Sequence, residues 1–208
     1  MRLRDIIYPP RCICCYNVVE SNRLTCSECE KKLKESINYV DYHTPNFDCT
    51  SLYKYNECTK GAVGNIKWKR SITICKKIGS LLADEAEKLH SKTPFDLVAY
   101  VPMTKRDKGD RGFNQCEVMA KVISKRLKLK FERNVLKKIR QTKPQKELTA
   151  AERAKNLKGA FKVCKDVEGK NILLIDDVIT TGSTLKENAK MLYKAGTNSV
   201  TVCTFAKA

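Results

Sequence analysis

The sequence predicts an α/β protein in which a mostly parallel sheet is flanked by helices and a small zinc ribbon precedes it. Two observations predict this fold class. From about residue 51 to residue 205, short apolar runs alternate with stretches whose apolar residues recur at helical spacing, a pattern typical of parallel sheets with helices on both faces. Two C-x2-C cysteine pairs lie before that region. Ligands of such sheets bind at the carboxyl ends of the strands.

The N-terminal segment, residues 1–45, is expected to form the zinc ribbon. Its cysteine pairs are separated by ten residues, and together they offer a closed shell of four thiolates, Cys12, Cys15, Cys26 and Cys29. A closed shell of this kind holds structural zinc and leaves no position for a catalytic water. Metal binding contributes on the order of 10–16 kcal/mol to folding such a module, which offsets its missing core. A helix over 27–37 and a linker over 41–46 complete the segment.

Residues 46–208 are expected to form the α/β domain. Its predicted elements rest on apolar periodicity, on Asn114 as a helix N-cap and on Gly196 as a helix stop. In chain order they are a strand at 51–55, a helix over 74–89, a strand at 96–102, a helix over 114–127, a strand at 172–175, a helix over 182–194 and a strand at 199–205.

The composition predicts a folded chain with an anionic partner. Hydrophobic residues make up 42% of the 208 residues, and 41 Lys and Arg against 23 Asp and Glu give a net charge of +18. Disordered chains lack this apolar content. The charge indicates nucleic acid, a phosphorylated small molecule or an anionic membrane surface. We see no amphipathic basic helix in the sequence, which puts the membrane surface last.

We expect a cytoplasmic protein without membrane insertion. No apolar run approaches the roughly 18 residues of a membrane span, and residues 1–12 lack the apolar core of a secretory signal. In the cytosol the eleven cysteines would be reduced. The seven outside the predicted zinc shell are therefore expected to be packing residues rather than disulfides.

The most informative stretch joins an apolar strand to two acids and a hydroxyl-rich loop. Residues 172–175 are Ile-Leu-Leu-Ile, and Asp176 and Asp177 follow them. A helix N-terminus beyond such a loop binds anions through its free N–H groups and its dipole, and adjacent carboxylates accept hydrogen bonds from the hydroxyls of a ribose. The stretch therefore predicts a phosphorylated-ribose site. The loop residues are Thr180, Thr181, Gly182, Ser183 and Thr184.

This stretch resembles the signature of the type I phosphoribosyltransferases, which bind phosphoribosyl pyrophosphate (PRPP), at all thirteen positions from Ile172 to Thr184. The resemblance implies that the two acids are catalytic and hold the ribose hydroxyls. It also implies that residues 180–184 hold the 5′-phosphate and that magnesium accompanies PRPP, mostly without direct protein ligands.

Two further segments are similar to ComF-type competence proteins, in which a zinc ribbon precedes a phosphoribosyltransferase domain. They are Arg111-Gly-Phe-Asn-Gln115, after Val101-Pro102, and the run from Arg140 to Phe161. The motifs span nearly the whole chain in the family's order. The resemblance implies a role in DNA uptake and natural transformation. Its implied partners are PRPP or a related ligand, single-stranded DNA, and uptake proteins such as a competence helicase.

The chain departs from the family pattern in three places. Only Cys49 and Cys58 stand where many relatives carry a second cysteine ribbon. Residues 67–70, Lys-Trp-Lys-Arg, replace the frequent Lys-Tyr-x-Gly, and residues 138–140, Lys-Ile-Arg, replace Arg-x-Arg. We expect Trp68 to be a packing or hinge residue rather than a base-stacking platform.

Phosphoribosyl transfer displaces pyrophosphate, so the protein has to neutralise the leaving group and exclude water. By resemblance, the segment after Val101-Pro102 corresponds to the family's pyrophosphate loop, and residues of about 130–165 correspond to its hood. The candidate pyrophosphate-binding residues are Lys105, Arg106, Arg111, Arg140, Lys146 and Arg153.

Two functional hypotheses stay open. The favoured one is a magnesium- and PRPP-dependent transferase acting on a nitrogenous or nucleic-acid acceptor. The other is a non-catalytic module that PRPP or a nucleotide regulates and that binds DNA. Residues 121–170 hold 17 Lys and Arg against 5 Asp and Glu, and this charge suits pyrophosphate closure and a nucleic-acid track equally.

Overall fold

The computed structural model describes residues 9–45, 47–142 and 149–208, without the side chains of residues 38–42, 150, 151, 153 and 154. Within these ranges, no helix combines the length and the apolar character that crossing a bilayer requires.

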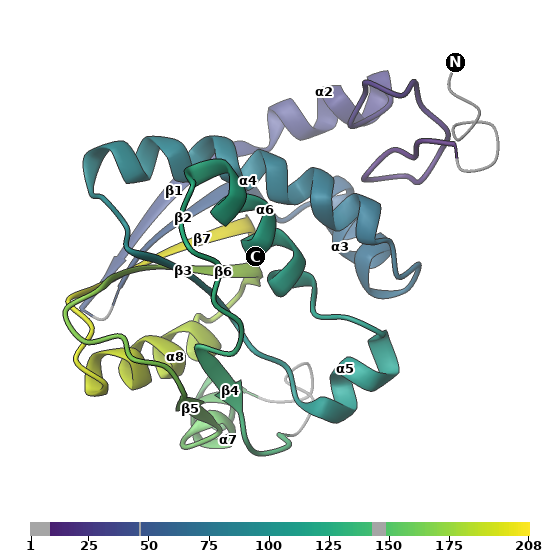
Figure 1. Cartoon of the computed structure of the whole chain (residues 1–208). Coiled ribbons are helices and arrows are strands. Elements are labelled where there is room, and N and C mark those ends of the chain that lie inside the picture. Colours follow the sequence, from purple (N-terminus) through teal and green to yellow (C-terminus); the bar gives the residue numbers. More distant parts are fainter. Residues whose placement is uncertain (1–8, 46, 143–148) are drawn as a thin grey trace.

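A five-stranded sheet forms the centre of the molecule (Figure 1). Its strand order is β1-β2-β7-β6-β3, with β1 antiparallel to β2 and every other pair parallel. The predicted fold class is confirmed. The strands are β1 (Ile37–Thr44), β2 (Phe47–Lys54), β3 (Leu97–Tyr100), β6 (Asn171–Ile179) and β7 (Ser199–Lys207).

Helices cover both faces of the sheet, because successive residues of the buried strands point to opposite sides. Leu173 and Ile175 pack with α4 (Ile72–Lys92) and α6 (Gln115–Leu127), whereas Ile172 and Leu174 pack with α8 (Ser183–Lys194). Figure 1 shows the same two layers. The predicted apolar face of α8, with Leu185, Ala189 and Leu192, is buried as expected.

A small second sheet lies below α8 in the view of Figure 1, in the segment predicted to be the hood. Strands β4 (Leu136–Lys138) and β5 (Phe161–Val163) are antiparallel. Helix α7 (Ala150–Leu157) precedes β5, and Leu157 and Phe161 pack against Met191 of α8. The hood segment is thus joined to the face of the domain that carries α8.

Three sequence predictions about strands differ from the structure, the first being the strand predicted at 51–55, which is β2 and begins at Phe47. Residues 41–44 were predicted to be linker but end strand β1, because their backbone pairs with β2 in a hairpin in which His43 faces Asp48. Strand β6 extends beyond the predicted residue 175 to Ile179 because β7 pairs with it throughout. The division of the chain at residue 45 stays a prediction.

The N-terminal ribbon is anchored to two helices of the domain. The side chain of Asn65 in α3 (Glu57–Lys67) donates hydrogen bonds to the carbonyl oxygens of Ile13 and Cys14, at 3.0 and 2.7 Å. Lys77 of α4 donates to the carbonyl oxygens of Arg11 and Arg23. The ribbon therefore sits at a fixed place on α3 and α4.

A disulfide between Cys14 and Cys58 adds a covalent link from the ribbon to α3, with Cα atoms 5.0 Å apart. The expectation that these two cysteines are unlinked packing thiols was wrong. Their 44-residue separation gave no sign that ribbon docking brings them side by side.

Gly61 in α3 is the point of closest approach between helix and ribbon. A Cβ atom at this position would lie 2.6 Å from the carbonyl oxygen of Cys14, whereas a Cβ at Gly64, one turn further on, would meet only Trp68 Cδ1 at 3.8 Å. We expect Gly61→Ala to lower the free energy of unfolding by about 1–3 kcal/mol through overpacking. Gly64→Ala should be neutral or raise it by about 0.5–1 kcal/mol.

Urea unfolding followed by circular dichroism measures both variants. Equal stability of Gly61→Ala and Gly64→Ala would show that the ribbon does not press on α3.

Candidate functional site

The four predicted zinc ligands come together at the ribbon. The Sγ atoms of Cys12, Cys15, Cys26 and Cys29 all lie within 4.8 Å of one another. Such a group of four thiols fits tetrahedral zinc.

The backbone around Cys12 is already arranged for a thiolate. Burial raises the pKa of this thiol, but hydrogen bonds from backbone N–H groups of Cys26, Cys15 and Cys14 outweigh it and lower the pKa to about 7. Because thiolates are the ligands of zinc, these amides favour the metal-binding form of Cys12. The cluster therefore supports structural zinc.

We expect about one zinc ion per chain after purification without chelator. Cys26→Ser should lose the metal and unfold the ribbon, since metal binding and folding are coupled in such modules. Cys164→Ser is the control, because that exposed thiol lies outside the cluster. Metal analysis and circular dichroism make the measurement. Unchanged metal content in Cys26→Ser would contradict the assignment.

The predicted ribose-binding acids lie inside strand β6 rather than beyond its end. Asp176 and Asp177 are buried, at 9% and 7% exposure, and Asp176 pairs with Thr204 of β7. The carboxylates also accept local backbone hydrogen bonds: Asp176 Oδ1 from the N–H of Asp177, and Asp177 Oδ1 from that of Val178, both at 2.9 Å. The acid pair is a rigid part of the central sheet.

Asp177 is held ionised by two residues from other elements. Lys67 Nζ, at the end of α3, lies 2.9 Å from Asp177 Oδ2, and Gln115 Nε2, at the start of α6, donates to the same oxygen at 3.1 Å. Burial by itself would raise the pKa of Asp177, but the Lys67 ammonium and the Gln115 amide hold it below its ordinary value. Arg111 extends the network by donating to Gln115 Oε1 at 2.8 Å.

Asp176 has the opposite electrostatic environment. Burial and the neighbouring charge of Asp177 raise its pKa to about 7, and the thiol of Cys116 donates to its Oδ1 at 3.3 Å. A carboxylate accepts hydrogen bonds with both oxygens only when ionised. At neutral pH, Asp176 can therefore lose its proton when hydrogen-bond donors or a cation arrive.

The predicted phosphate loop connects β6 to α8. Gly182 is the N-cap of α8 and has φ +71°, a conformation that glycine adopts without strain. Thr181 and Ser183 place their hydroxyl oxygens 2.9 Å apart. The N-cap residue Gly182 has no side chain to cap α8, and free amides at a helix N-terminus are what an anion site requires.

Two family models match the chain. Residues 114–208 match the model described as "Phosphoribosyl transferase domain", and residues 3–39 match the model described as "Double zinc ribbon domain". The first range contains the acid pair and the phosphate loop, and the second contains the four-thiol cluster.

Curated relatives match most of the chain. "Competence protein F" of Haemophilus influenzae is 28% identical over 222 residues, which covers 95% of this chain and 97% of that protein. The "Competence protein ComFC" of Bacillus subtilis is 30% identical over 147 residues, or 70% of this chain and 58% of that protein. The chain belongs to the ComF family.

A third ComF-family relative is the "DNA utilization protein YhgH" of Escherichia coli, which is 32% identical over 145 residues. That alignment covers 67% of this chain and 63% of that protein. The chain thus spans less than two thirds of the length of the E. coli and B. subtilis relatives.

Solved structures similar to this ComF-family chain include "phosphoribosylpyrophosphate synthetase from Mycobacterium smegmatis", with TM-score 0.38, 18% identity, and coverage of 62% of this chain and 33% of that one. "Leishmania donovani UMP synthase" has TM-score 0.39, 17% identity, and coverage of 85% and 30%. Both TM-scores lie below 0.5, so the fold assignment rests on the strand order and the family model.

The predicted pyrophosphate-binding residues are not all gathered at the acid pair. Lys105 and Arg106 are exposed on α5 (Lys105–Arg111), and Arg111 reaches Gln115 at the acids. Arg140 donates instead to two carbonyl oxygens near the end of α7, those of Asn156 and Lys158, at 2.9 and 3.0 Å.

Lys146 lies outside the described residues, and Arg153 is among the residues whose side chains are not described. A pyrophosphate role for all six candidates stays a prediction.

Sequence reasoning missed Lys67, Gln115 and Cys116 as neighbours of the acids. Lys67 and Gln115 belong to segments already noted for their resemblance to the family, but only the fold shows that α3 and α6 aim them at one carboxylate. Trp68 is 80% exposed, so the expectation that it packs was wrong, whereas the alternative of a hinge residue stays a prediction.

Removing the ammonium of Lys67 should destabilise the fold, because the buried carboxylate of Asp177 then lacks its cation. In Lys67→Met we expect the pKa of Asp177 to rise and the free energy of unfolding at pH 7 to fall by about 2 kcal/mol, because a buried carboxylate loses its partner. A carboxylate whose pKa is lower in the folded than in the unfolded state stabilises the fold at pH values above its unfolded pKa, and this contribution is lost as the pH falls. The deficit should therefore shrink as the pH is lowered toward 4.

Urea unfolding between pH 4 and pH 8 tests this. Lys69→Met serves as control, since the Lys69 ammonium faces the ring of Tyr16 rather than an acid. A deficit independent of pH would mean that Lys67 acts by packing and not by charge.

Proposed function

We propose that this chain is a cytoplasmic PRPP-binding protein that takes part in DNA uptake by handling incoming single-stranded DNA, and that it acts as a magnesium- and PRPP-dependent phosphoribosyltransferase. The observation that carries the proposal is the juxtaposition of a buried acid pair with the phosphate loop on one strand-to-helix connection. The relatives' names, "Competence protein F" and "DNA utilization protein", support the role in DNA uptake.

The two acids suit the two hydroxyls of a ribose in different ways. Asp177 is ionised and already accepts hydrogen bonds from Lys67 and Gln115. Asp176, with a pKa of about 7, gains acceptor capacity when it ionises. The 5′-phosphate would then lie against residues 180–184, where the N–H groups of α8 and the hydroxyls of Thr181 and Ser183 face it.

Magnesium would be held mainly by oxygen atoms. Oxygen ligands are preferred by this hard cation, which usually keeps waters and bridges substrate phosphates. The carboxylates of Asp176 and Asp177 lie with Cys116 Sγ within 4.8 Å of one another, and the thiol is a poor ligand for magnesium. When bound, the ion would neutralise charge on the pyrophosphate, while Lys67 and Arg111 supply positive charge from the protein.

Pyrophosphate release and PRPP binding together test the proposal. With magnesium and PRPP, and with single-stranded DNA as candidate acceptor, we expect release that disappears in Asp176→Asn with Asp177→Asn. The double variant should also weaken PRPP binding by at least about 100-fold by calorimetry, because two charged hydrogen bonds are lost and each contributes about 1.5–3 kcal/mol. Asp84→Asn, which changes a surface carboxylate paired with Arg126, should leave both unchanged.

The outcomes separate the two functional hypotheses. Tight PRPP binding without release under any acceptor would favour the non-catalytic, PRPP-regulated DNA-binding module. Absence of PRPP binding in the zinc-loaded protein would contradict the proposal as a whole.

A further inference from the structure

Three surface grooves form one connected path that begins beside the acid pair. The first groove, of about 440 Å³, is lined by Lys67, Trp68 and Arg111 among others. The second, of about 690 Å³, shares Pro102, Met103 and Lys138 with the first. We call the whole path the connected groove.

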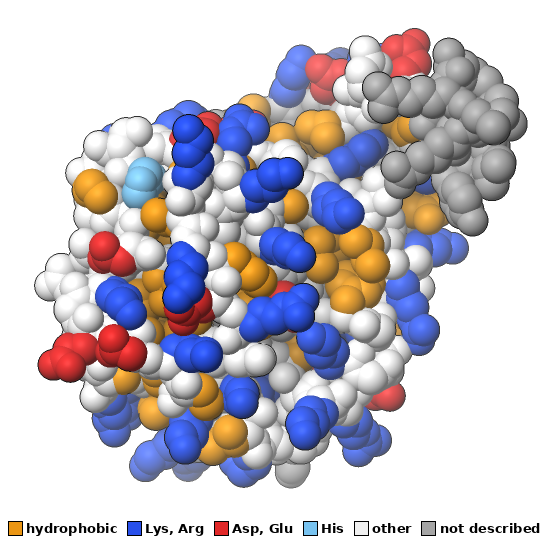
Figure 2. Space-filling model, in the orientation of Figure 1, with side chains coloured by type: hydrophobic (Ala, Val, Ile, Leu, Met, Phe, Trp, Pro, Cys, Tyr) orange, Lys and Arg blue, Asp and Glu red, His pale blue; other side chains and the backbone are white. Residues whose placement is uncertain are grey.

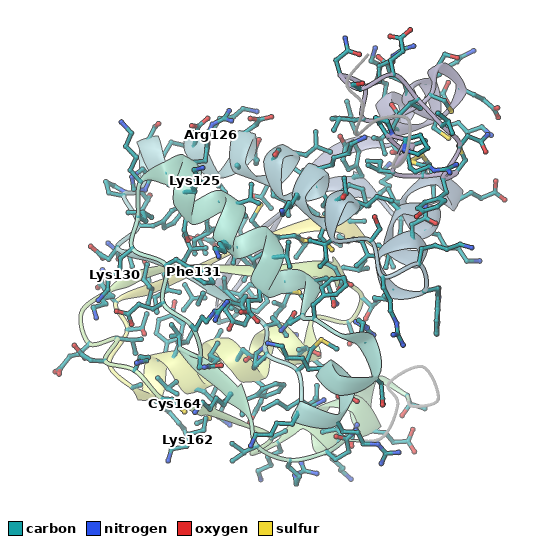
Figure 3. The ribbon with its side chains drawn as sticks, turned by 45° about the vertical axis from the view of Figure 1, so that its right-hand side comes forward. Lys125, Arg126, Lys130, Phe131, Lys162 and Cys164 are labelled. Carbon is teal, nitrogen blue, oxygen red and sulfur yellow. A yellow bond between two sulfur atoms is a disulfide. The ribbon has the colours of Figure 1, made fainter. Side chains whose placement is uncertain are left out.

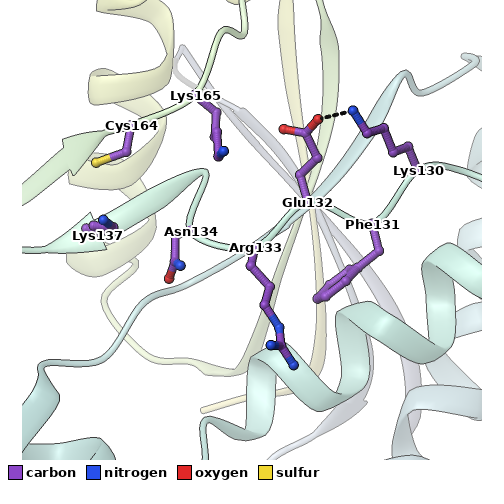
Figure 4. Close-up of a pocket in the computed structure, with 8 residues that line it drawn as sticks. All are labelled: Lys130, Phe131, Glu132, Arg133, Asn134, Lys137, Cys164 and Lys165. Atoms are coloured by element: carbon purple, nitrogen blue, oxygen red, sulfur yellow. Dashed lines mark ion pairs between the residues drawn. The ribbon is translucent and has the colours of Figure 1, made fainter.

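The third groove, of about 510 Å³, shares Asn134 and Lys137 with the second and completes the connected groove. Figure 4 shows its lining, with an ion pair between Lys130 and Glu132. Lys130, after α6, and Cys164, after β5, line this last part (Figure 3). The path thus runs from the acid pair toward the hood.

The lining of the connected groove is strongly basic. It contains eleven Lys and Arg side chains against four Asp and Glu. Some of these charges pair within the lining, Glu117 with Lys108 and Arg133 and Glu132 with Lys130, and the remaining basic side chains still outnumber the remaining acids eight to two. Lys and Arg side chains are spread over much of the surface seen in Figure 2. A chain of negative charges fits this lining.

Exposed apolar side chains accompany the charges. Trp68, at 80% exposure, is the most exposed large hydrophobic residue in the described ranges, and Ile139, at 61%, lines the second part of the groove. Trp68 follows Lys67 directly, and Lys67 contacts Asp177 at 2.9 Å. The exposed indole of Trp68 therefore lies at the end of the basic path that contains Lys67, the residue that contacts the acid pair.

We propose that the connected groove binds a single-stranded nucleic acid whose phosphates lie along the basic lining and one of whose bases stacks on Trp68, next to the acid pair. Stacking on an exposed aromatic ring needs an unpaired base and is tolerant of sequence. Duplex DNA and acidic peptides could meet the charge but lack a free base. The proposal rests on the proposed function, which it deepens by placing the single strand and the nucleotide that reaches the PRPP site.

The chain has one tryptophan, so its fluorescence reports on position 68 alone. We expect titration of the full-length protein with a 20-nucleotide oligothymidylate to quench this fluorescence. By anisotropy of a labelled oligonucleotide, Trp68→Ala should weaken binding about 5- to 100-fold, and Trp68→Phe should keep most of the affinity. Tyr55→Ala, an exposed aromatic outside the groove, is the matched control.

The charged lining has its own signature. Lys137→Ala with Lys138→Ala should reduce the slope of log affinity against log salt by about 1.4 for a single strand, because two phosphate contacts are lost. Lys31→Ala with Lys60→Ala, on exposed positions of α2 (Ser27–Glu35) and α3 outside the groove, should leave the slope unchanged.

Three results would overturn the proposal: unchanged fluorescence at saturation, equal affinity of Trp68→Ala and wild type, or equal affinity for duplex DNA or polyglutamate. PRPP binding, measured on the same variants by calorimetry, distinguishes failure of this inference from failure of the proposed function. Intact PRPP binding beside unaffected oligonucleotide binding in Trp68→Ala rejects this inference alone. Thermal unfolding of each variant excludes misfolding as the cause of a loss.

Discussion

The charge of Asp177 inside the central sheet is the constraint on which the site depends. A carboxylate at this depth keeps its charge only when a cation and hydrogen-bond donors reach it. Lys67 and Gln115 do so from the end of α3 and the start of α6. Two helices that enclose the same end of β6 are thereby tied to one oxygen atom. Burial, together with the charge that Asp177 already carries, raises the pKa of the neighbouring Asp176.

The ion pair between Lys67 and Asp177 also connects the ribbon to the candidate site. Helix α3 is fixed at one side by the ribbon, through the disulfide at Cys58 and the amide of Asn65. Its last residue, Lys67, contacts Asp177. Zinc bound to the four thiols would therefore stabilise the position of a side chain in the site without approaching it. A structural metal can in this way influence the affinity of the candidate site for its ligand, since metal binding that stabilises the folded ribbon also stabilises the position of α3.

Sequence patterns predicted those features of the candidate sites whose residues lie close together in the chain. The zinc ligands share two short spacings, and the acids and phosphate loop lie within nine residues, so spacing and periodicity were sufficient. The disulfide and the Lys67–Asp177 pair join residues that lie 44 and 110 positions apart in the sequence, so only the fold reveals them. The exposure of Trp68 likewise depends on how distant segments pack around it. Strand β1 was missed for a related reason: an edge strand is polar, and only its pairing with β2 distinguishes it from a linker.

The contrast between β6 and its surroundings has an evolutionary consequence. The acid pair is embedded in β6, a buried strand of the central sheet, where almost any substitution disturbs the sheet as well as the candidate site. Much of the connected groove is lined by exposed side chains, such as Lys105, Lys137 and Ile139, and substitutions at these positions leave the core intact. Selection can therefore change the exposed lining of the groove residue by residue while the acid pair on β6 is inherited unchanged. Sequence divergence within such a family should accumulate at the exposed residues of the connected groove and spare the acid pair on β6.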